Sequence, residues 1–458
     1  MMTLTPDAVA MLVGATEESR KNGENDPVSK IILQAALNLS LRHGQEVPRK
    51  TDPSRILFQP IEPFLIDFAI GSKQQARIER GSLPYIWTWL ERDLIPEEVA
   101  RLGPAIDELT TNGQTADAEK LTNELRRAAI DAIAGIFRIF QEHPEERLRF
   151  AGQLGSEQAL DDAGDVVTIF IHAASLQKLN SKLPDRIPSL EGDILASVIN
   201  DLGALIDRDP ILRPFALVLV MAKLQNRSEI IRIAKAAVNS DASMKLESHP
   251  YRDAVELVLY EANCKARQAQ DALGMTEGSG KVGELLHDYY SLAHGLNVEI
   301  EISSTSKWAK KIIKMRSGLS DRISAVIGDT PRQIKSLLSF DKEKSKTVPE
   351  HEIVFVENLL MRLAQCRRIS GELALNEMLS RVRRDSEQYL NLLSDSLVER
   401  LRHSDRETRG PLTERLEIAE RLSRVALGDE VADLLRRSGV LAKQFSEAEE
   451  AALEKQSA

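Results

Sequence analysis

The feature that most constrains the fold is a helical spacing of apolar residues, which recurs along most of the chain. Residues 117–143 show it well: apolar side chains fall three or four positions apart, and charged side chains occupy the opposite face. Aromatic residues make up only 4% of the chain, and few segments have the composition of strands. We therefore predict an all-α fold.

The predicted helices between residues 151 and 275 are separated by short polar or proline-bearing turns. This pattern favours a multi-helical array of antiparallel helix pairs. In layout alone it resembles the α-solenoids of HEAT or tetratricopeptide type, or an irregular bundle, since the sequence shows neither a fixed period nor the tetratricopeptide spacing. Leu-rich helical segments from residue 347 onward predict a C-terminal helical bundle.

A chain of 458 residues is too long for one compact core, so we expect several domains. Proline after Thr5 and after Asp26 predicts two opening helices.

TEGSGKVG at 276–283 predicts a flexible loop, and the alternation of apolar and acidic residues from Val298 to Ile302 predicts a short strand. The predicted parts are an N-terminal helical domain with an aromatic cluster (1–150), a helix-pair array (151–275), a linker with a basic amphipathic helix (276–346) and the C-terminal bundle (347–458).

Charge and composition limit the partners and the compartment. The net charge of −10 argues against general binding to nucleic acid. Cys264 and Cys366 lie far apart without a CxxC partner, which predicts reduced thiols. The sequence has no signal-peptide pattern and no apolar run long enough to cross a membrane, so we expect a cytoplasmic protein without a transmembrane segment.

The common catalytic signatures are missing from the sequence: it contains no GxxxxGK[ST], GxSxG or HExxH. Gly278, Gly280 and Gly283 spell GxGxxG, but no strand precedes them, so we interpret them as part of a loop. The nearest acidic cluster, Asp161 and Asp162 in LDDAGD, is interpreted as a set of helix-cap and turn residues. No cofactor is predicted.

Metal binding has one weak candidate. Glu284 and His287 form a Glu-x-x-His pair, and His294 lies two helical turns after His287. Di-iron carboxylate bundles need this pair twice, with two further glutamates, and the sequence has no second copy. We therefore expect these three side chains to be surface or boundary residues.

The segment SLPYIWTWLERDLIP, at residues 82–96, concentrates aromatic residues in an aromatic-poor chain. On a helical wheel one face is apolar, and we predict that this face is buried: Leu83, Ile86, Trp87, Leu90 and Leu94. Tyr85 and Trp89 point to a second side, shared with Arg92. Either another layer covers these two rings, for example the segment with Phe58, Phe64 and Phe68, or they bind a partner protein.

Residues 303–320 contain no acidic side chain. An apolar stripe of Trp308, Ile312, Met315 and Leu319 is flanked by five cations: Lys307, Lys310, Lys311, Lys314 and Arg316. The stripe could pack inside the protein, leaving the lysines solvated or paired. Alternatively, the segment contacts an anionic membrane surface with Trp308 at the interface, nucleic-acid phosphates or an acidic partner.

These features favour a non-enzymatic, cytoplasmic helical adaptor or scaffold that binds another protein, with an anionic-surface contact through residues 305–319. Two alternatives stay open: an enzyme with an unrecognised site in the helical interior, and a peripheral membrane-binding protein. The sequence does not indicate an oligomeric state.

Overall fold

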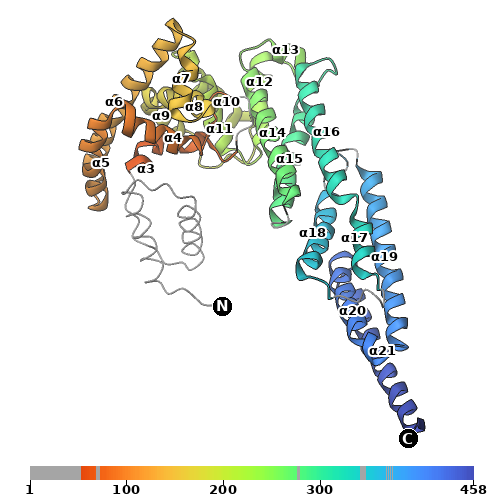
Figure 1. Ribbon diagram of the computed structural model, residues 1–458. Helices are drawn as coiled ribbons and strands as arrows, with labels where there is room; N and C mark the ends of the chain where they lie inside the picture. The colour runs from red at the N-terminus through yellow and green to blue at the C-terminus, as the bar shows by residue number, and fades with distance from the viewer. Residues whose placement is uncertain are drawn as a thin grey trace. The chain divides into compact units, whose positions relative to one another are not determined.

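The computed structural model describes residues 53–68, 73–275, 279–340, 347–367, 369, 371, 373 and 375–457 (Figure 1). The two predicted opening helices lie outside these residues. Within the described residues the chain forms 19 α-helices and almost no strands, so the predicted all-α multi-helical array is confirmed.

The chain divides into two compact units. Unit 1 comprises Met1–Leu57 and Pro96–Arg127, and unit 2 comprises Phe58–Ile95 and Ala128–Ala458. The described helices of unit 1 are α3 (Pro53–Leu57), α5 (Pro96–Thr111) and the first part of α6 (Thr115–Glu142). Arg126 donates to the carbonyl oxygens of Leu57 (3.0 Å) and Ile56 (2.8 Å), which joins α6 to the end of α3. The four predicted domains stay a prediction.

Unit 2 begins with irregular backbone, as its prolines require. The 3₁₀-helix η1 (Gln59–Phe64) leads into a two-residue strand, β1 (Leu65–Ile66), which pairs in parallel with β2 (Ile78–Glu79). Next come α4 (Ser82–Trp89) and the π-helical turn η2 (Leu90–Leu94), which closes with a hydrogen bond from Ile95 N to Leu90 O (2.9 Å).

The helices from residue 146 to residue 274 pack both on their neighbours in sequence and on more distant elements, since α8 also contacts α4 and β2, and α11 also contacts η1 and α14. The apolar segment at residues 165–179, whose spacing predicts one helix, forms parts of two helices that meet at His172. The most apolar segment, residues 215–222, predicts a core helix, and it is buried from Phe215 to Met221, whereas Ala222 is exposed. The elements are α7 (Glu146–Leu154), α8 (Glu157–Ile171), α9 (Ala173–Lys182), α10 (Gly192–Ile206), η3 (Pro210–Leu212), α11 (Arg213–Lys223), η4 (Arg227–Ile230), α12 (Ile231–Val238), α13 (Ser243–Glu247) and α14 (Arg252–Gly274).

Two predictions fail at α15 (Ser279–Glu299). The predicted loop over residues 279–283 is helical, while residues 276–278 lie outside the described residues. The predicted strand does not form either, because α15 takes Val298 and Glu299, and beyond it Glu301 makes only an isolated parallel β-bridge with Ala242. The next helix, α16 (Lys307–Ile327), packs against α14.

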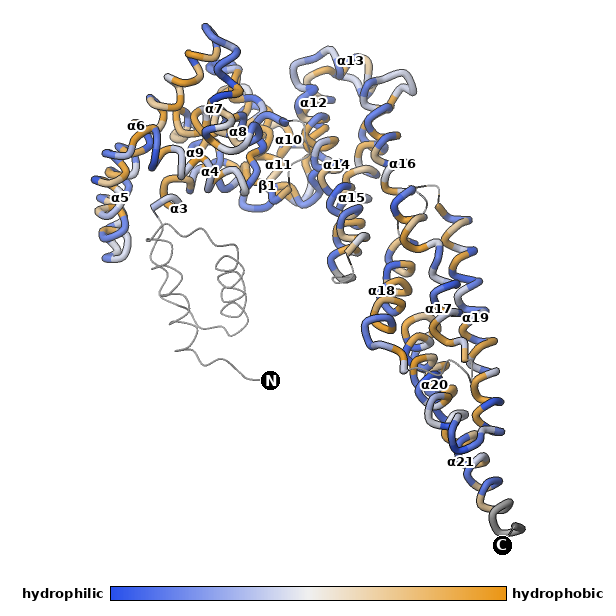
Figure 2. Tube along the Cα trace, viewed as in Figure 1, coloured by the Kyte–Doolittle hydropathy of each residue, from blue (hydrophilic) through white to orange (hydrophobic). Residues whose placement is uncertain are grey.

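The C-terminal bundle is confirmed: its helices share one apolar core. The core includes Ile334 and Leu337 of α17, which precedes residue 347. Gly410 and Pro411 predict that a helix begins only after them, but both lie inside α20, because Asp405 caps this helix ahead of them through a hydrogen bond from Thr408 N (2.9 Å). The helices, along which apolar and polar residues alternate in Figure 2, are α17 (Thr330–Leu338), α18 (Glu350–Arg367), α19 (Asn376–Arg402), α20 (Arg406–Ala426) and α21 (Asp429–Ser457).

Candidate functional site

The two predicted aromatic contacts on α4 have different environments. Trp89 is 1% exposed and packs edge-to-face on Phe150 of α7, with ring centroids 6.5 Å apart. Tyr85 is 50% exposed. The prediction that Trp89 points away from the core is therefore wrong, and only Tyr85 presents its ring at the surface.

The buried face of α4 is rotated from the predicted one. Ser82, Ile86, Trp89 and Leu90 are buried, whereas Trp87 is only half-buried. Ile86 and Leu90 belong to both the predicted and the observed face. The observed buried face is therefore a modest rotation of the predicted one about the helix axis, and this rotation buries Trp89 in place of Trp87. The cover over Trp89 also differs from the predicted one, because Phe150 supplies it.

Tyr85 and Arg92 both lie against the end of α7. The ring of Tyr85 would be 3.4 Å from a Cβ atom placed on Gly155, whose φ of +86° already favours glycine. Arg92 Nη2 donates to the carbonyl oxygen of Gln153 (3.3 Å) and pairs with Asp93 (2.6 Å). The guanidinium is 60% exposed and lies in the π-helical turn, a conformation often found at functional sites.

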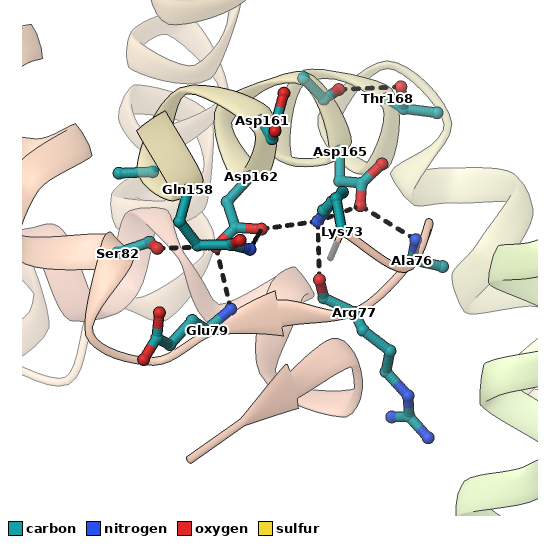
Figure 3. A network of polar contacts seen from close by, with 12 residues as sticks. Lys73, Ala76, Arg77, Glu79, Ser82, Gln158, Asp161, Asp162, Asp165 and Thr168 are labelled. Carbon is teal, nitrogen blue, oxygen red and sulfur yellow. Dashed lines mark hydrogen bonds and ion pairs between the residues drawn. The ribbon is translucent and has the colours of Figure 1, made fainter. Parts of the chain in front are cut away.

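A buried polar network holds the segment before α4 on α8 (Figure 3). Lys73 Nζ lies 2.6 Å from a carboxylate oxygen of both Asp162 and Asp165. Asp162 also accepts hydrogen bonds from Ser82 Oγ (2.6 Å), Glu79 N (3.0 Å) and Gln158 Nε2 (3.1 Å). The network therefore joins β2 and the first residue of α4 to one side chain of α8.

Asp165 holds a strained turn in the same segment. Ala76 has a φ of +65°, which is costly for alanine, and its N–H donates to Asp165 (2.9 Å). Burial raises the pKa of Asp165, and the neighbouring Lys73 opposes this shift. Both the ammonium group and the backbone of Ala76 thus stabilise the carboxylate.

The interpretation of Asp161 and Asp162 as helix-cap and turn residues is wrong. Both lie inside α8, and with Asp165 they form a D-D-x-x-D spacing. In the folded chain the oxygens of Asp162 and Asp165 accept from the protein's own donors, and Asp161 pairs with Arg147 (2.5 Å). The D-D-x-x-D spacing was the one sequence signal for this network. No sequence pattern indicated that Lys73 belongs to it.

A second buried ion pair lies beyond the network. Arg77 pairs with Glu261 of α14, whose other oxygen accepts from Arg227 Nη1 (3.1 Å). Burial, together with the charge of Arg227, lowers the pKa of Arg77 to about 10. The guanidinium therefore keeps its charge at neutral pH and links the start of β2 to α14.

On α16 the predicted apolar stripe is buried. Trp308, Ile312, Met315 and Leu319 face the interior, and the helix contacts α14 and α18. Trp308 is 2% exposed, so the predicted interfacial position of its ring is wrong for this fold. The helix is capped by Ser306, which accepts from Ala309 N (2.9 Å).

The cations of α16 separate into two groups. Lys307, Lys310, Lys311 and Lys314 are exposed on the side opposite the buried stripe, and none forms an ion pair with a carboxylate of the described part of the chain. Arg316 is half-buried and already interacts within the protein. The exposed group, which we call the lysine face, therefore consists of four residues.

The three metal candidates do not form a ligand set. Glu284, His287 and His294 are exposed on α15, and Tyr290 stacks on His294 with centroids 5.4 Å apart. The two histidines line a hollow of about 340 Å³ between α15 and η4, which Glu284 does not reach. Within the described ranges, no group of three or more His, Cys, Asp or Glu side chains is placed to hold a metal ion.

A larger hollow of about 740 Å³ lies between α12 and the end of α15. Four of its five charged side chains pair with one another: Glu299 accepts from Arg232 Nε (2.7 Å) and Lys235 Nζ (2.9 Å), and Arg232 also reaches Glu191 (2.6 Å). These contacts hold α12 and α15 together, and they use the groups that a charged ligand would need.

No protein-family model matches this chain, and no significant match is found to a curated protein or to a solved structure. Of the helices that the structure describes, none is long and apolar enough to cross a membrane. The surfaces described above are therefore the only basis for the functional proposals below.

Proposed function

We propose that this protein is a non-enzymatic, cytoplasmic helical adaptor that binds another protein through Tyr85 and Arg92. One observation carries the proposal: a half-exposed tyrosine ring of α4 and an exposed guanidinium of η2 lie two helical turns apart, both beside the end of α7. Tyrosine and arginine are among the residues that contribute most to binding at protein interfaces.

Rigidity supports this role, because a contact that is already ordered loses less conformational entropy on binding. Trp89 anchors α4 on Phe150, and Ser82 anchors its first turn on Asp162. The Tyr85 ring packs beside Gly155, and Arg92 is held by Asp93 and the carbonyl group of Gln153. Both contact groups are thus held in place on the surface of the free protein.

The test is affinity purification of the full chain from its native cells, followed by quantitative mass spectrometry. We expect a stoichiometric partner to co-purify with the wild type. The amount of this partner recovered with the double variant Tyr85→Ala/Arg92→Ala should fall by roughly tenfold or more, as for the loss of an interface hot spot. Met244→Ala, which removes an exposed side chain from α13, is the matched control and should retain the partner. Equal partner recovery with the double variant and the wild type would refute the proposal.

A second candidate function is contact with an anionic surface through the lysine face. Four exposed ammonium groups on one side of α16 have no carboxylate partner among the described residues. Each lysine near an anionic membrane contributes about 1 kcal/mol of binding free energy. Because Trp308 is buried, this contact would be electrostatic and would weaken with salt.

Vesicle sedimentation tests the second candidate, using phosphatidylcholine alone or mixed with phosphatidylserine. We expect the wild type to sediment only with the anionic vesicles, because the attraction depends on charge. Replacing the four lysines by glutamine should abolish binding, whereas replacing them by arginine should preserve it. Binding of the glutamine variant at the wild-type level would exclude the lysine face as the contact.

A further inference from the structure

The hollow of about 340 Å³ between α15 and η4 is a feature that the adaptor proposal does not use. Its volume lies at the lower end of the range for small-molecule sites, about 300–1,000 Å³. Tyr290 and His294 form one wall, and their rings stack almost in parallel, at an interplanar angle of 9°. A planar ligand can extend such a stack, because every heteroaromatic ring has a π-face. This wall therefore fits a planar heteroaromatic ligand.

Two side chains that line the hollow hold N–H donors in fixed positions. The amide oxygen of Asn226 accepts from Ser228 N (3.3 Å) and Ser228 Oγ (2.8 Å), and no described residue accepts from the NH₂ group at the other end of this amide. Arg232 donates through Nε to Glu299 and through Nη1 to Glu191, while its Nη2 group has no acceptor in the described part of the chain. The hollow thus offers two ordered donor groups.

The carboxylate acceptor beside these donors is already used. Both oxygens of Glu299 accept, one from Arg232 Nε (2.7 Å) and the other from Lys235 Nζ (2.9 Å). The other polar groups of the lining are hydroxyl groups and imidazole rings, which can donate or accept and so do not discriminate between ligands: Tyr290, Ser291, His287 and His294. The ordered groups therefore select a ring edge that carries acceptors only.

We propose that this hollow binds a free nucleoside with a 6-oxopurine base, such as inosine or guanosine. The N7–O6 edge of such a base carries two acceptors and no donor, which matches the NH₂ group of Asn226 and the Nη2 group of Arg232. The corresponding edge of adenine carries an N6–H₂ donor, which meets these donors without an acceptor. The base stacks on the Tyr290–His294 pair, as nucleobases do on aromatic side chains.

Charge favours a nucleoside over a nucleotide. The hollow shares Arg232, Val298 and Glu299 with the larger hollow of about 740 Å³, so a ligand that extends beyond its base reaches that side. The charged side chains of the larger hollow are three carboxylates and two cations, which leaves one surplus negative charge: Glu191, Asp241, Glu299, Arg232 and Lys235. A phosphate group would add negative charge to this surplus, which is unfavourable.

Isothermal titration calorimetry of the full chain is the first test, with inosine, guanosine, adenosine and guanosine monophosphate as probes. We expect saturable binding of inosine and guanosine with similar affinity, because both carry the N7–O6 edge. Adenosine should bind at least tenfold more weakly. The monophosphate should bind no more tightly than guanosine. Absence of saturable inosine binding, similar affinities for inosine and adenosine, or tighter binding of the monophosphate would overturn the proposal.

Asn226→Asp tests the donor pattern with a nearly isosteric change. Aspartate keeps an oxygen that accepts from Ser228, but it replaces the NH₂ group by an acceptor. We expect the ratio of inosine affinity to adenosine affinity to fall at least tenfold, a change that a merely structural role of Asn226 would not produce. Asn239→Asp, which adds the same charge in the larger hollow, is the matched control and should keep the wild-type ratio. An unchanged ratio in Asn226→Asp would contradict the proposal.

Two substitutions of Tyr290 test the stacking. Tyr290→Ala should weaken inosine binding at least tenfold, whereas Tyr290→Phe, which keeps the ring, should bind like the wild type. Circular dichroism should show equal helix content in all the variants. Equal inosine affinity in Tyr290→Ala and Tyr290→Phe would refute the stacking. This inference does not depend on the adaptor proposal, because Tyr85→Ala/Arg92→Ala should bind inosine like the wild type.

Discussion

At the residue scale, Asp162 organises the polar contacts beneath α4. Its two carboxylate oxygens accept from an ammonium group, a hydroxyl group, a backbone N–H and a side-chain amide. All four donors are satisfied within the protein, so we assign this carboxylate a structural role. Removing its charge would leave Lys73 with one carboxylate and leave other donors facing an amide group.

We predict that Asp162→Asn lowers the free energy of unfolding by about 2–4 kcal/mol, because a buried charged acceptor is lost. Urea unfolding followed by far-UV circular dichroism measures the change. Asp161→Asn is the adjacent control: its ion pair with Arg147 is partly exposed, and its loss should cost less than about 1 kcal/mol. Equal costs for the two variants would show that Asp162 has no special role.

At the scale of elements, a buried arginine terminates α14. Arg362 of α18 is 1% exposed and donates to the carbonyl oxygens of Leu273 (3.2 Å) and Met275 (2.5 Å). A cation is favourable at a helix C-terminus, where carbonyl groups have no partner within the helix. This contact joins two helices that lie almost ninety residues apart in sequence.

We predict that Arg362→Met, which keeps the side-chain length, destabilises the fold by about 2–4 kcal/mol by leaving buried carbonyl groups without donors. Arg400→Met is the matched control, because Arg400 also donates to one backbone carbonyl, that of Phe340 (3.0 Å), but lies at the surface. Thermal unfolding should show a clear loss for the first variant and little change for the second. The reverse order would contradict the capping role.

At the scale of the whole molecule, the net charge of −10 is compatible with one local positive surface, because α16 keeps its lysines on a single face.

Helix positions were largely predictable from the sequence, since the spacing of apolar residues and the turn residues are local signals. The stripe of α16 is buried, which is one of the two arrangements that its sequence allowed. The errors arose where a local signal had two solutions, as in the alternating residues 298–302, which allowed either a strand or the end of a helix. Both occur: burial of Leu292 and Leu296 carries the helix to Glu299, and Glu301 beyond it makes an isolated β-bridge with Ala242.

The candidate sites were less predictable, because they depend on residues distant in sequence. Lys73 gave no signal, and it matters only because α8 brings Asp162 and Asp165 to it. The D-D-x-x-D spacing was visible but did not reveal that a lysine neutralises two of its members.

The aromatic segment separates what local sequence determines from what tertiary packing decides. Its residues establish a helix with two overlapping apolar sides, because helical periodicity depends only on neighbours along the chain. Which side is buried depends on Phe150, which receives the Trp89 ring, and on Asp162, which binds Ser82. Both come from later helices, so only the folded structure could place Trp89 inside and leave Tyr85 beside Arg92 at the surface.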